Sequence, residues 1–360
     1  MPARIAYYIS GHGYGHAARQ HPILRRLAAQ GAQIFVRSSA PAKFFRMPGV
    51  LHHAQAYDVG MRQADALTMD VPGSLAAYAA LLREQDAIIA AEVDFLRGGG
   101  VQLVVSDMPP LAFEIGAAAC LPSVAITHFT WDWVYAHYID RYPEYAPLIA
   151  AIRASYGKAT AALELPYAHE FDMFPRVEKM PFVVNDVTRS RADLCAEFGV
   201  DPAQRIALLS MGGLGWGSGD VRAIAALRDW VFMVMPGAWE QVRHLPNVRL
   251  IPMDYPDYHN WIAAADVLIG KAGGSTVSEV IAHRTPMIYT LRDDWRENAL
   301  LDAALRECCK SLCLPLADFE GGRWVEALEA FHAQPYTWPS VAVDGAERIA
   351  ARLLALVDDA

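Results

Sequence analysis

Short apolar runs alternate with helical segments along two separate stretches of the chain, and this alternation limits the possible folds more than any other feature. In the first stretch the runs 4–10, 101–107 and 122–127 are apolar and rich in β-formers. The second stretch includes a compact strand–turn–helix–strand unit over 266–290. Helices between short apolar strands are typical of parallel sheets with right-handed crossovers. The pattern predicts an α/β protein with two doubly wound domains in tandem.

Length and local composition place the boundaries of these domains. A chain of 360 residues is too long for one ordinary core and comfortable for two domains. We predict an N-terminal domain over 1–165 and a second domain over 188–340. Between them, 166–187 contains three prolines and mixed polarity, so we interpret it as the connection. The last segment, 341–360, is predicted as a helix with one apolar stripe, formed by Ile349, Leu353, Leu354 and Leu356.

Charge and cysteine content exclude several classes of partner. The 31 basic and 40 acidic residues give a formal net charge of −9, and no Lys/Arg cluster offsets it, so we do not expect nucleic acid to bind. Cys308, Cys309 and Cys313 lie close together, but no histidine or second cysteine pair completes a zinc pattern. Buried thiols are therefore favoured over a metal or redox site, and we expect no bound metal.

The sequence shows no targeting or membrane-spanning segment. The N-terminus, MPARIAYYIS, has too short an apolar run for a signal peptide, and no stretch reaches the roughly 18 apolar residues of a spanning helix. We expect a cytoplasmic protein; peripheral contact with a membrane surface stays open.

The stretch SGHGYGHAAR, residues 10–19, places three glycines at alternate positions with His12 and His16 among them. It follows the strand predicted at 4–10, and Asp107 and His128 also lie at or just beyond predicted strand ends. Parallel sheets bind ligands at the carboxyl ends of their strands. The spacing is not the dinucleotide fingerprint G-x-G-x-x-G, and the acidic residue expected about 20 positions later is missing. We therefore expect a ligand site of another kind.

A second glycine turn lies in GKAGGSTVSEV, residues 270–280. A helix is predicted to start near Ser275 or Thr276, and its free N–H groups could bind a phosphate or diphosphate. Glu279, one turn further, could accept hydrogen bonds from ribose hydroxyls. A simple capped helix is the alternative, which the glycine-rich stretch 210–220 weakens because it ends at the same predicted sheet edge. Neither turn matches the P-loop, since Lys271 precedes the glycines.

The segment 129–145, FTWDWVYAHYIDRYPEY, holds two Trp and four Tyr. Two interpretations are open. The rings could stack on the C–H faces of an acceptor sugar, or they could form an aromatic core or a dimer contact.

Five motifs in order along nearly the whole chain carry a resemblance: GHGYGHAAR, RQADALTMD, VVSDMPP, THFTWDWVYAHY and GKAGGSTVSE. Together they resemble the glycosyltransferase-like N-terminal domain of L-arabinokinase-type proteins. GHGYGH and GGSTVSEV are more remotely similar to the GT-B glycosyltransferases, including the enzyme that adds N-acetylglucosamine to the peptidoglycan lipid precursor.

The resemblance implies a GT-B fold, in which two Rossmann-like domains face a cleft and the nucleotide-sugar donor lies mainly on the C-terminal domain. It also implies that the C-terminal helix returns to pack on the N-terminal domain. The donor is expected as substrate, with UDP favoured, and no further cofactor is expected. The implied donor-binding residues are Gly13, Gly15, Gly212, Gly213, Gly273, Gly274, Ser275 and Thr276 at the diphosphate, Glu279 at the ribose, Met253 at the base, and Glu297 and Asn298 at the sugar.

His16 matches the histidine of the GT-B N-terminal loop, and the resemblance implies that it takes a proton from an acceptor hydroxyl. Alternatively, His12 and His16 only hydrogen-bond the loop and the phosphates. Asp107 could orient one of these histidines or bind the acceptor; as a strand-end carboxylate it could also cap the following helix.

Two departures from the family patterns limit what carries over. Retaining GT-B enzymes use a Glu-x7-Glu pair, and Lys271 stands at the matching first position, with seven residues between it and Glu279, so we expect an inverting transferase. The kinase domain of the L-arabinokinase-type proteins is not matched, so sugar-kinase activity is not expected. A non-catalytic nucleotide-sugar-binding module, and an epimerase or hydrolase of nucleotide sugars, stay as alternatives.

Overall fold

The computed structural model describes residues 2–63, 67–211, 222–235, 242–255 and 257–358. The chain divides into two compact units. Unit 1 comprises Met1–Arg62, Met69–Val184 and Ala342–Ala360, and unit 2 comprises Gln63–Thr68 and Asn185–Val341. Each unit contains one parallel sheet with helices on it, as the alternation of the sequence predicts.

The sheet of unit 1 is entirely parallel and has the strand order β3-β2-β1-β6-β7-β8-β9. The chain runs outward from β1 to β3 and then crosses back to continue from β6, so the order reverses between β1 and β6. In doubly wound sheets ligands bind at this switch point, outside the carboxyl ends of the strands. The strands are β1 (Arg4–Ile9), β2 (Gln33–Arg37), β3 (Val50–His53), β6 (Leu103–Asp107), β7 (Ser123–Thr127), β8 (Ala161–Glu164) and β9 (Val177–Lys179).

Helices cover both faces of this sheet. Helix α1 (Gly15–Ala29) packs on one face, where Ile5, Tyr7 and Ile9 point, and α2 (Val71–Gly98) with α3 (Leu111–Ala119) packs on the other, where Ala6 and Tyr8 point. Successive side chains of β1 thus point to opposite faces of the sheet, as expected for a strand that is buried on both sides. The remaining helices of the unit are α4 (Trp131–Ala136), α5 (Ala146–Tyr156) and α12 (Gly345–Asp358), with short 3₁₀ turns η1 (Ala42–Phe45) and η2 (Pro143–Tyr145).

Unit 2 repeats the same topology with a six-stranded parallel sheet of order β12-β11-β10-β13-β14-β15, so its switch point lies between β10 and β13. Helices α10 and α11 supply Phe319, Trp324 and Leu328 to the core on one face. The strands are β10 (Arg205–Ser210), β11 (Trp230–Val234), β12 (Val248–Leu250), β13 (Val267–Lys271), β14 (Met287–Thr290) and β15 (Ser311–Cys313). The helices are α6 (Arg191–Phe198), α7 (His259–Ala264), α8 (Gly274–His283), α9 (Asn298–Cys308), α10 (Leu316–Glu320) and α11 (Arg323–Ala333), with η3 (Arg222–Ala226). A two-stranded ladder joins β4 (Arg62–Gln63) and β5 (Met69–Asp70).

The segment 166–187, expected as the connection, differs from that expectation. It contributes β9, which pairs in parallel with β8 and forms the edge of the unit 1 sheet. Because of its three prolines, Pro166, Pro175 and Pro181, this segment reads as a loop in the sequence. All three lie outside the three-residue strand β9, so they do not prevent it from pairing with β8. Unit 1 accordingly extends to Val184.

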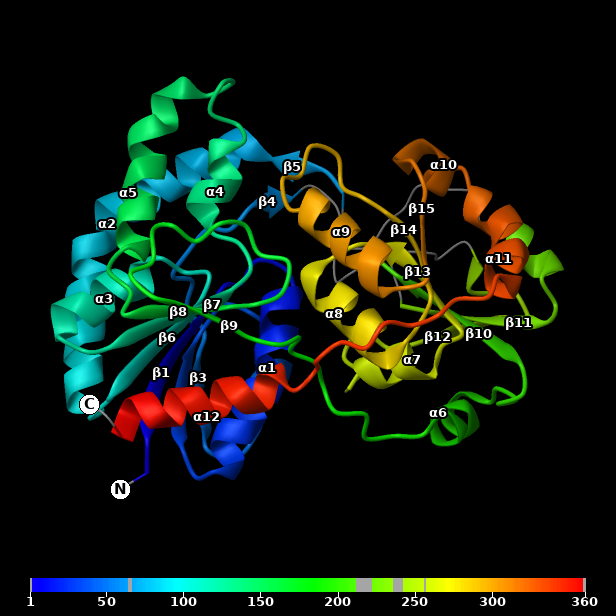
Figure 1. Ribbon diagram of the computed structural model, residues 1–360, viewed down its shortest axis with the longest axis horizontal. Coiled ribbons are helices and arrows are strands. Elements are labelled where there is room, and N and C mark those ends of the chain that lie inside the picture. The colour runs from blue at the N-terminus through cyan, green and yellow to red at the C-terminus, as the bar shows by residue number, and fades with distance from the viewer. Residues whose placement is uncertain (1, 64–66, 212–221, 236–241, 256, 359–360) are drawn as a thin grey trace. The chain divides into compact units, whose positions relative to one another are not determined.

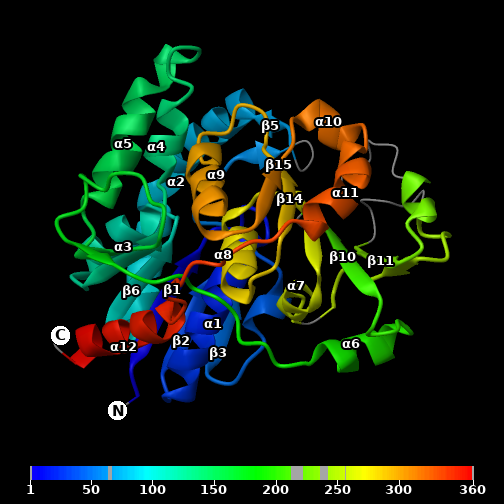
Figure 2. The ribbon, with the colours of Figure 1, turned by 45° about the vertical axis from the view of Figure 1, so that its right-hand side comes forward.

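The C-terminal helix α12 belongs to unit 1 and lies beside α1, as both ribbon views show (Figure 1, Figure 2). Ile349, Ala350, Leu353 and Val357 are buried in the same core cluster as Ile23 and Leu27 of α1, whereas Leu354 and Leu356 pack at its border. The apolar stripe therefore has its partner within unit 1.

Leu353→Ala is expected to lower the free energy of unfolding by about 2–5 kcal/mol, because it removes a fully buried side chain from this cluster. Leu354→Ala, one position along on the same helix and only half-buried, is the matched control and is expected to cost less. Denaturant titration of the two variants measures the difference, and equal losses would contradict the role given to this packing.

Candidate functional site

Two loops meet at the switch point of the unit 1 sheet. One follows β1 and carries the alternate glycines, and the other follows β6 and begins at Asp107, the last residue of that strand. The Ser10 N–H donates to the Asp107 backbone carbonyl at 3.0 Å, which ties the two loops together. The sequence expectation that both features lie at the carboxyl edge of one sheet is therefore met.

The glycine loop leads directly into α1. Gly13 has φ +65°, in the left-handed region that favours glycine, and this turn reverses the chain after the strand. Gly15 is the first residue of α1 and His16 the second, so the imidazole lies in the first turn of the helix. The loop thus determines that His16 lies at the carboxyl edge of the sheet.

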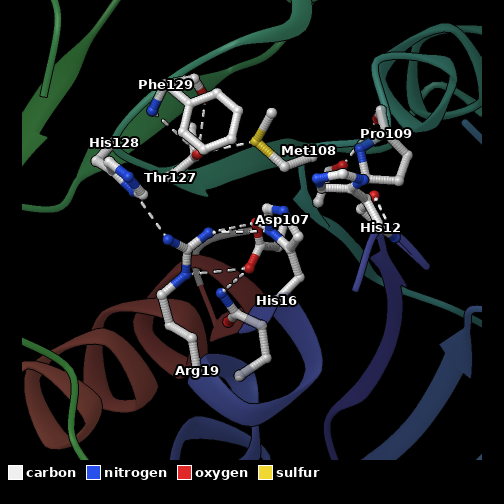
Figure 3. A network of polar contacts seen from close by, with 12 residues as sticks. His12, His16, Arg19, Asp107, Met108, Pro109, Thr127, His128 and Phe129 are labelled. Atoms are coloured by element: carbon white, nitrogen blue, oxygen red, sulfur yellow. Dashed lines mark hydrogen bonds and ion pairs between the residues drawn. The ribbon is translucent and has the colours of Figure 1, made fainter. Parts of the chain in front are cut away.

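Asp107 is completely buried and is surrounded by donors from α1 (Figure 3). Its Oδ1 lies 2.9 Å from His16 Nδ1 and 2.7 Å from Arg19 Nη2. Its Oδ2 accepts from Arg19 Nε at 3.3 Å and from Gln20 Nε2 at 2.5 Å. The three donors stand at helical positions i, i+3 and i+4, which lie on one face of α1. The Asp107 carboxylate therefore contacts three side chains that span one turn of α1.

The charge state of Asp107 follows from these contacts. Burial by itself would raise the pKa of Asp107, but the Arg19 guanidinium and the His16 imidazole outweigh burial and hold that pKa well below its ordinary value. An ionised carboxylate can only accept hydrogen bonds, so in the shorter, 2.9 Å contact His16 donates its Nδ1–H. Arg19 Nη2 also lies 3.2 Å from this nitrogen, and because a protonated ring nitrogen cannot accept, that approach is not a hydrogen bond in this tautomer. His16 Nε2 then carries the lone pair, and it makes no hydrogen bond within the described part of the chain.

Arg19 also reaches the end of the neighbouring strand. Its Nη1 lies 2.8 Å from Nδ1 of His128, which follows β7 (Figure 3). Because a guanidinium only donates, His128 Nδ1 accepts this bond. Gln20 is fixed in turn by the Tyr7 hydroxyl, which donates to its carbonyl oxygen. Arg19 and Gln20 were not among the residues predicted from the sequence, although their i+3 and i+4 spacing from His16 is a readable signal.

His12, the other histidine of the loop, has a different environment. Its Nδ1 accepts from the Met61 N–H at 3.3 Å, and its ring lies edge-on to Trp131 with centroids 5.4 Å apart. A Cβ built on Gly60 would lie 2.6 Å from the His12 Cβ, so the side chain packs closely on that backbone. His12 therefore contacts the loop that precedes β4, and its ring centroid lies 6.2 Å from that of His16.

The aromatic segment after β7 is mostly core. Trp131, Tyr135 and Tyr138 are almost completely buried, and Trp131 Nε1 donates to Asp58 at 2.9 Å. Trp133 is half-buried and stacks on His169 with centroids 4.7 Å apart. Of the two interpretations left open by the sequence, the structure favours the aromatic core for the three buried rings.

In unit 2 the predicted phosphate turn has the expected geometry. β13 ends at Lys271, Gly273 is the N-cap of α8 in an extended conformation, and the helix begins at Gly274. Ser275 and Thr276 lie in the first turn and are half-buried. The first N–H groups of a helix have no partner within the helix and carry its positive dipole end, so this turn can receive an anion. Gly212 and Gly213 lie outside the described residues.

Glu279 is buried at 3 % exposure and already has partners from two directions. Its Oε1 accepts from the Asn185 backbone N–H at 3.0 Å and from the Asn185 amide at 2.7 Å, and its Oε2 lies 2.9 Å from His283 Nε2. The sequence reasoning did not anticipate these contacts. One lone pair of Oε2 remains for a further donor, since each carboxylate oxygen can accept about two bonds.

The other predicted donor residues lie at separate points of unit 2. Met253 follows β12 and is half-buried. Glu297 is buried, and its Oε2 accepts from Trp295 Nε1 at 2.7 Å and lies 3.7 Å from Arg292. Asn298 is the first residue of α9 and donates to the Arg292 carbonyl at 2.7 Å. Their contacts with a donor stay predictions.

Comparison with solved structures gives the class of fold. The glycosyltransferase VinC in complex with dTDP matches over 99 % of this chain and 95 % of its own, with a TM-score of 0.62 and 14 % identity. UGT2 of Phytolacca americana, complexed with UDP-2-fluoro-glucose and pterostilbene, matches over 99 % and 94 % (TM-score 0.61, 12 % identity), and MurG of Acinetobacter baumannii over 98 % and 100 % (0.55, 13 %). The chain therefore has the GT-B fold, and that prediction is confirmed.

Comparison with curated proteins gives a nearer relative. The chain is 31 % identical over 335 residues to an L-arabinokinase of Arabidopsis thaliana, which covers 90 % of this chain but only 32 % of the relative. The resemblance predicted from the five motifs is confirmed, and the chain spans about a third of the length of the relative it matches. No family model matches the chain. Among the described helices, none is both long and apolar enough to cross a bilayer.

Proposed function

We propose that this chain is a glycosyltransferase that moves a sugar from a nucleoside-diphosphate donor to an acceptor hydroxyl. The observation that carries the proposal is the His16–Asp107 pair at the switch point of unit 1, with Nδ1 committed to a buried carboxylate. The GT-B fold supports it, and so do the neighbours whose bound nucleotides are dTDP and a UDP-sugar. The sugar, the base and the acceptor are not part of the proposal.

In the proposed reaction His16 Nε2 takes the proton of the acceptor hydroxyl as that oxygen attacks the anomeric carbon. The new glycosidic bond forms as the bond from the anomeric carbon to the diphosphate oxygen breaks, which inverts the anomeric centre. The imidazolium that results is stabilised by Asp107, which the Arg19 and Gln20 contacts keep ionised and oriented. The acid–base pair is thus prepared before any ligand binds.

The leaving diphosphate carries the developing negative charge of the reaction. We propose that the first turn of α8, with Gly273, Gly274, Ser275 and Thr276, receives it through backbone N–H groups and hydroxyls. We further propose that Gly13, Gly15, Gly212 and Gly213 approach the same phosphates, that Met253 borders the base, and that Glu297 and Asn298 contact the sugar. No metal held by the protein is required in this proposal.

A product assay tests the proposal against its alternatives. A transferase releases nucleoside diphosphate and forms an acceptor adduct, both in equal amounts. A hydrolase releases the diphosphate without an adduct, an epimerase changes the donor sugar, and a binding module does neither. A panel of nucleotide sugars, ranked first by thermal shift, selects the donor for the assay because ligand binding raises the apparent stability. Binding without any turnover in the presence of acceptor sugars would contradict the proposed activity.

Glu279→Ala is expected to weaken UDP binding by about 1–3 kcal/mol, because the ribose hydroxyls lose an acceptor and Asn185 loses its partner. Calorimetry of UDP binding measures it. His283→Ala is the matched control: it removes the other neighbour of the carboxylate and leaves the oxygens in place. Unchanged UDP affinity in Glu279→Ala, with the fold retained, would refute the ribose assignment.

A further inference from the structure

Lys271 occupies the position in unit 2 that Asp107 does in unit 1. It is the last residue of β13, one of the two strands at the switch point, and the preceding Gly270 pairs with Ser210 at the end of β10. The N-cap of α8 follows two residues later. Its side chain therefore starts at the sheet edge where a ligand of this unit is expected.

The ammonium of Lys271 is buried without a partner. The residue is 8 % exposed and makes no hydrogen bond or ion pair within the described part of the chain. The charged groups that act on it, Arg292 and Glu297, both come from the connection between β14 and α9. Glu297 itself accepts from Trp295 and lies 3.7 Å from Arg292. Glu297 is therefore already engaged with two groups of the same connection.

A structural lysine in the same unit looks different. The Nζ of Lys310, a residue that is 9 % exposed, donates to the His332 carbonyl at 2.9 Å and also to the Gln334 carbonyl. Buried ammonium groups are normally satisfied in this way, since an unpaired one loses its hydration and gains nothing. The unpaired Nζ of Lys271 therefore points to a partner other than the described residues of the chain.

We propose that Lys271 is the counter-charge for an anionic oxygen of the bound donor, and that donor binding takes up a proton at its Nζ. This inference rests on the proposed function and deepens it. The anion is either the diphosphate or a carboxylate on the donor sugar. We assign it to the diphosphate, because the first turn of α8 begins next to Lys271 and binds the same kind of group.

The protonation state of the unliganded site supports the proton uptake. Burial, with a smaller effect from Arg292, holds the pKa of Lys271 well below its ordinary value, while Glu297 acts in the opposite direction. An anion placed against Nζ favours the charged form and raises that pKa. Between the two values the free protein is neutral at Nζ and the complex is charged, so binding consumes a proton. Donor affinity must then fall as the pH rises through this window, by up to about tenfold per pH unit.

Calorimetry of UDP and dTDP binding at several pH values from about 8 up to the ordinary lysine pKa of about 10.4, repeated in buffers of different ionisation enthalpy, counts the protons. At these pH values the nucleotide phosphates are fully ionised, since their second pKa is about 6. We expect the wild type to take up a proton, and Lys271→Met to take up none and bind at least about tenfold more weakly. Lys271→Arg, a cation that does not titrate, should bind near wild-type affinity with no uptake. Lys310→Met should leave the proton count unchanged.

Further arms of the experiment identify the anion. Uridine in place of UDP should abolish the uptake if the partner is the diphosphate. If UDP and UDP-glucose show no uptake and UDP-glucuronate does, the partner is instead a sugar carboxylate. Lys271→Met is expected to unfold no more easily than the wild type, because it replaces a buried amine that has no hydrogen-bond partner among the described residues with an apolar side chain, so folding does not obscure the result.

Two outcomes overturn the inference and are distinguishable. If UDP or dTDP binds and both the proton count and the affinity are the same in Lys271→Met, the inference fails while the proposed function stands. If none of the nucleotides or nucleotide sugars binds the wild type, the proposed function fails and the inference with it.

Discussion

Asp107→Asn is expected to lower the free energy of unfolding by about 3–5 kcal/mol, because it leaves the buried Arg19 guanidinium without its countercharge. An amide nitrogen would also face at least one of the donors that now converge on the carboxylate from His16, Arg19 and Gln20. Turnover should fall on the order of a hundredfold or more, since the imidazolium formed at His16 loses its stabilising charge. Urea denaturation and initial rates measure the two effects.

The pH dependence of this loss has a definite sign. The pKa of Asp107 is depressed in the folded protein, so its contribution is present above the ordinary carboxyl value of about 3.9 and disappears as the pH falls through the lowered value. The stability difference between wild type and Asp107→Asn should therefore be constant across neutral pH and shrink only in acid. A difference that shrank already between pH 8 and 6 would contradict the ionised, arginine-paired state.

Asp58→Asn is the matched control for this variant. Asp58 is buried in the same unit, but its partners are the neutral Ser10 and Trp131 side chains, and burial raises its pKa. An asparagine can still accept the Trp131 N–H through its carbonyl oxygen. The expected loss is below about 1 kcal/mol, the scale of one neutral hydrogen bond. An equal loss in both variants would show that burial, rather than pairing with Arg19, determines the cost.

The strands that the sequence predicts are those with continuous apolar runs. Residues 4–10, 101–107 and 122–127 contain β1, β6 and β7, which are buried on both faces and carry no polar period to obscure them. The sequence pattern misses β8, which is buried inside the sheet, because its four residues, AALE, include no β-branched or aromatic side chain. Two other missed strands, β9 and β15, lie at the sheet edges, have three residues each, and are half-exposed. Such short edges are determined by pairing with a neighbour, and sequence periodicity does not record that pairing.

The long helix of unit 1 shows the same limit at its start. The apolar spacing of residues 74–100 predicts a helix capped by Ser74, whereas α2 begins at Val71 with Asp70 as its N-cap, the Asp70 side chain accepting from the Gly73 N–H at 3.0 Å. Ser74 instead donates to the Asp70 carbonyl. Both residues are good caps by type, and the proline at position 72 decides between them because it suits the first turn of a helix.

The contacts of the candidate site likewise divide into those between residues close together in the sequence, which could be predicted, and those between residues far apart, which could not. His16 and Asp107 could be predicted because each lies at or just beyond a strand end, and the carboxyl ends of parallel strands meet at one edge of the sheet. Their 2.9 Å contact joins residues that are 91 positions apart in the sequence, and the contact of Arg19 with Asp107 joins residues 88 positions apart. No local sequence pattern records either contact. The partners of Glu279 divide likewise: His283 is one helical turn away, but Asn185 is 94 residues away.

His16→Ala is expected to lower kcat by about a hundredfold or more, because the acceptor hydroxyl loses the group that takes its proton. The Kd for the donor should change little, since the diphosphate is proposed to bind at the first turn of α8 in unit 2. The unfolding free energy should fall less than in Asp107→Asn, because Arg19 and Gln20 keep their bonds to the carboxylate. Comparing kcat with the donor Kd for the same variant separates a base from a residue that only steadies the loop.

His12→Ala is the control, because His12 belongs to the same loop but contacts Met61 and Trp131. Its expected effect is on stability, with kcat at saturating donor close to that of the wild type. A loss confined to the donor Kd in His16→Ala would mean that this histidine only supports the loop. A larger loss of kcat in His12→Ala than in His16→Ala would show that His16 is not the base. The expected order follows from the structure: His16 has one ring nitrogen fixed by a buried, ionised carboxylate, and its other ring nitrogen makes no hydrogen bond within the described residues.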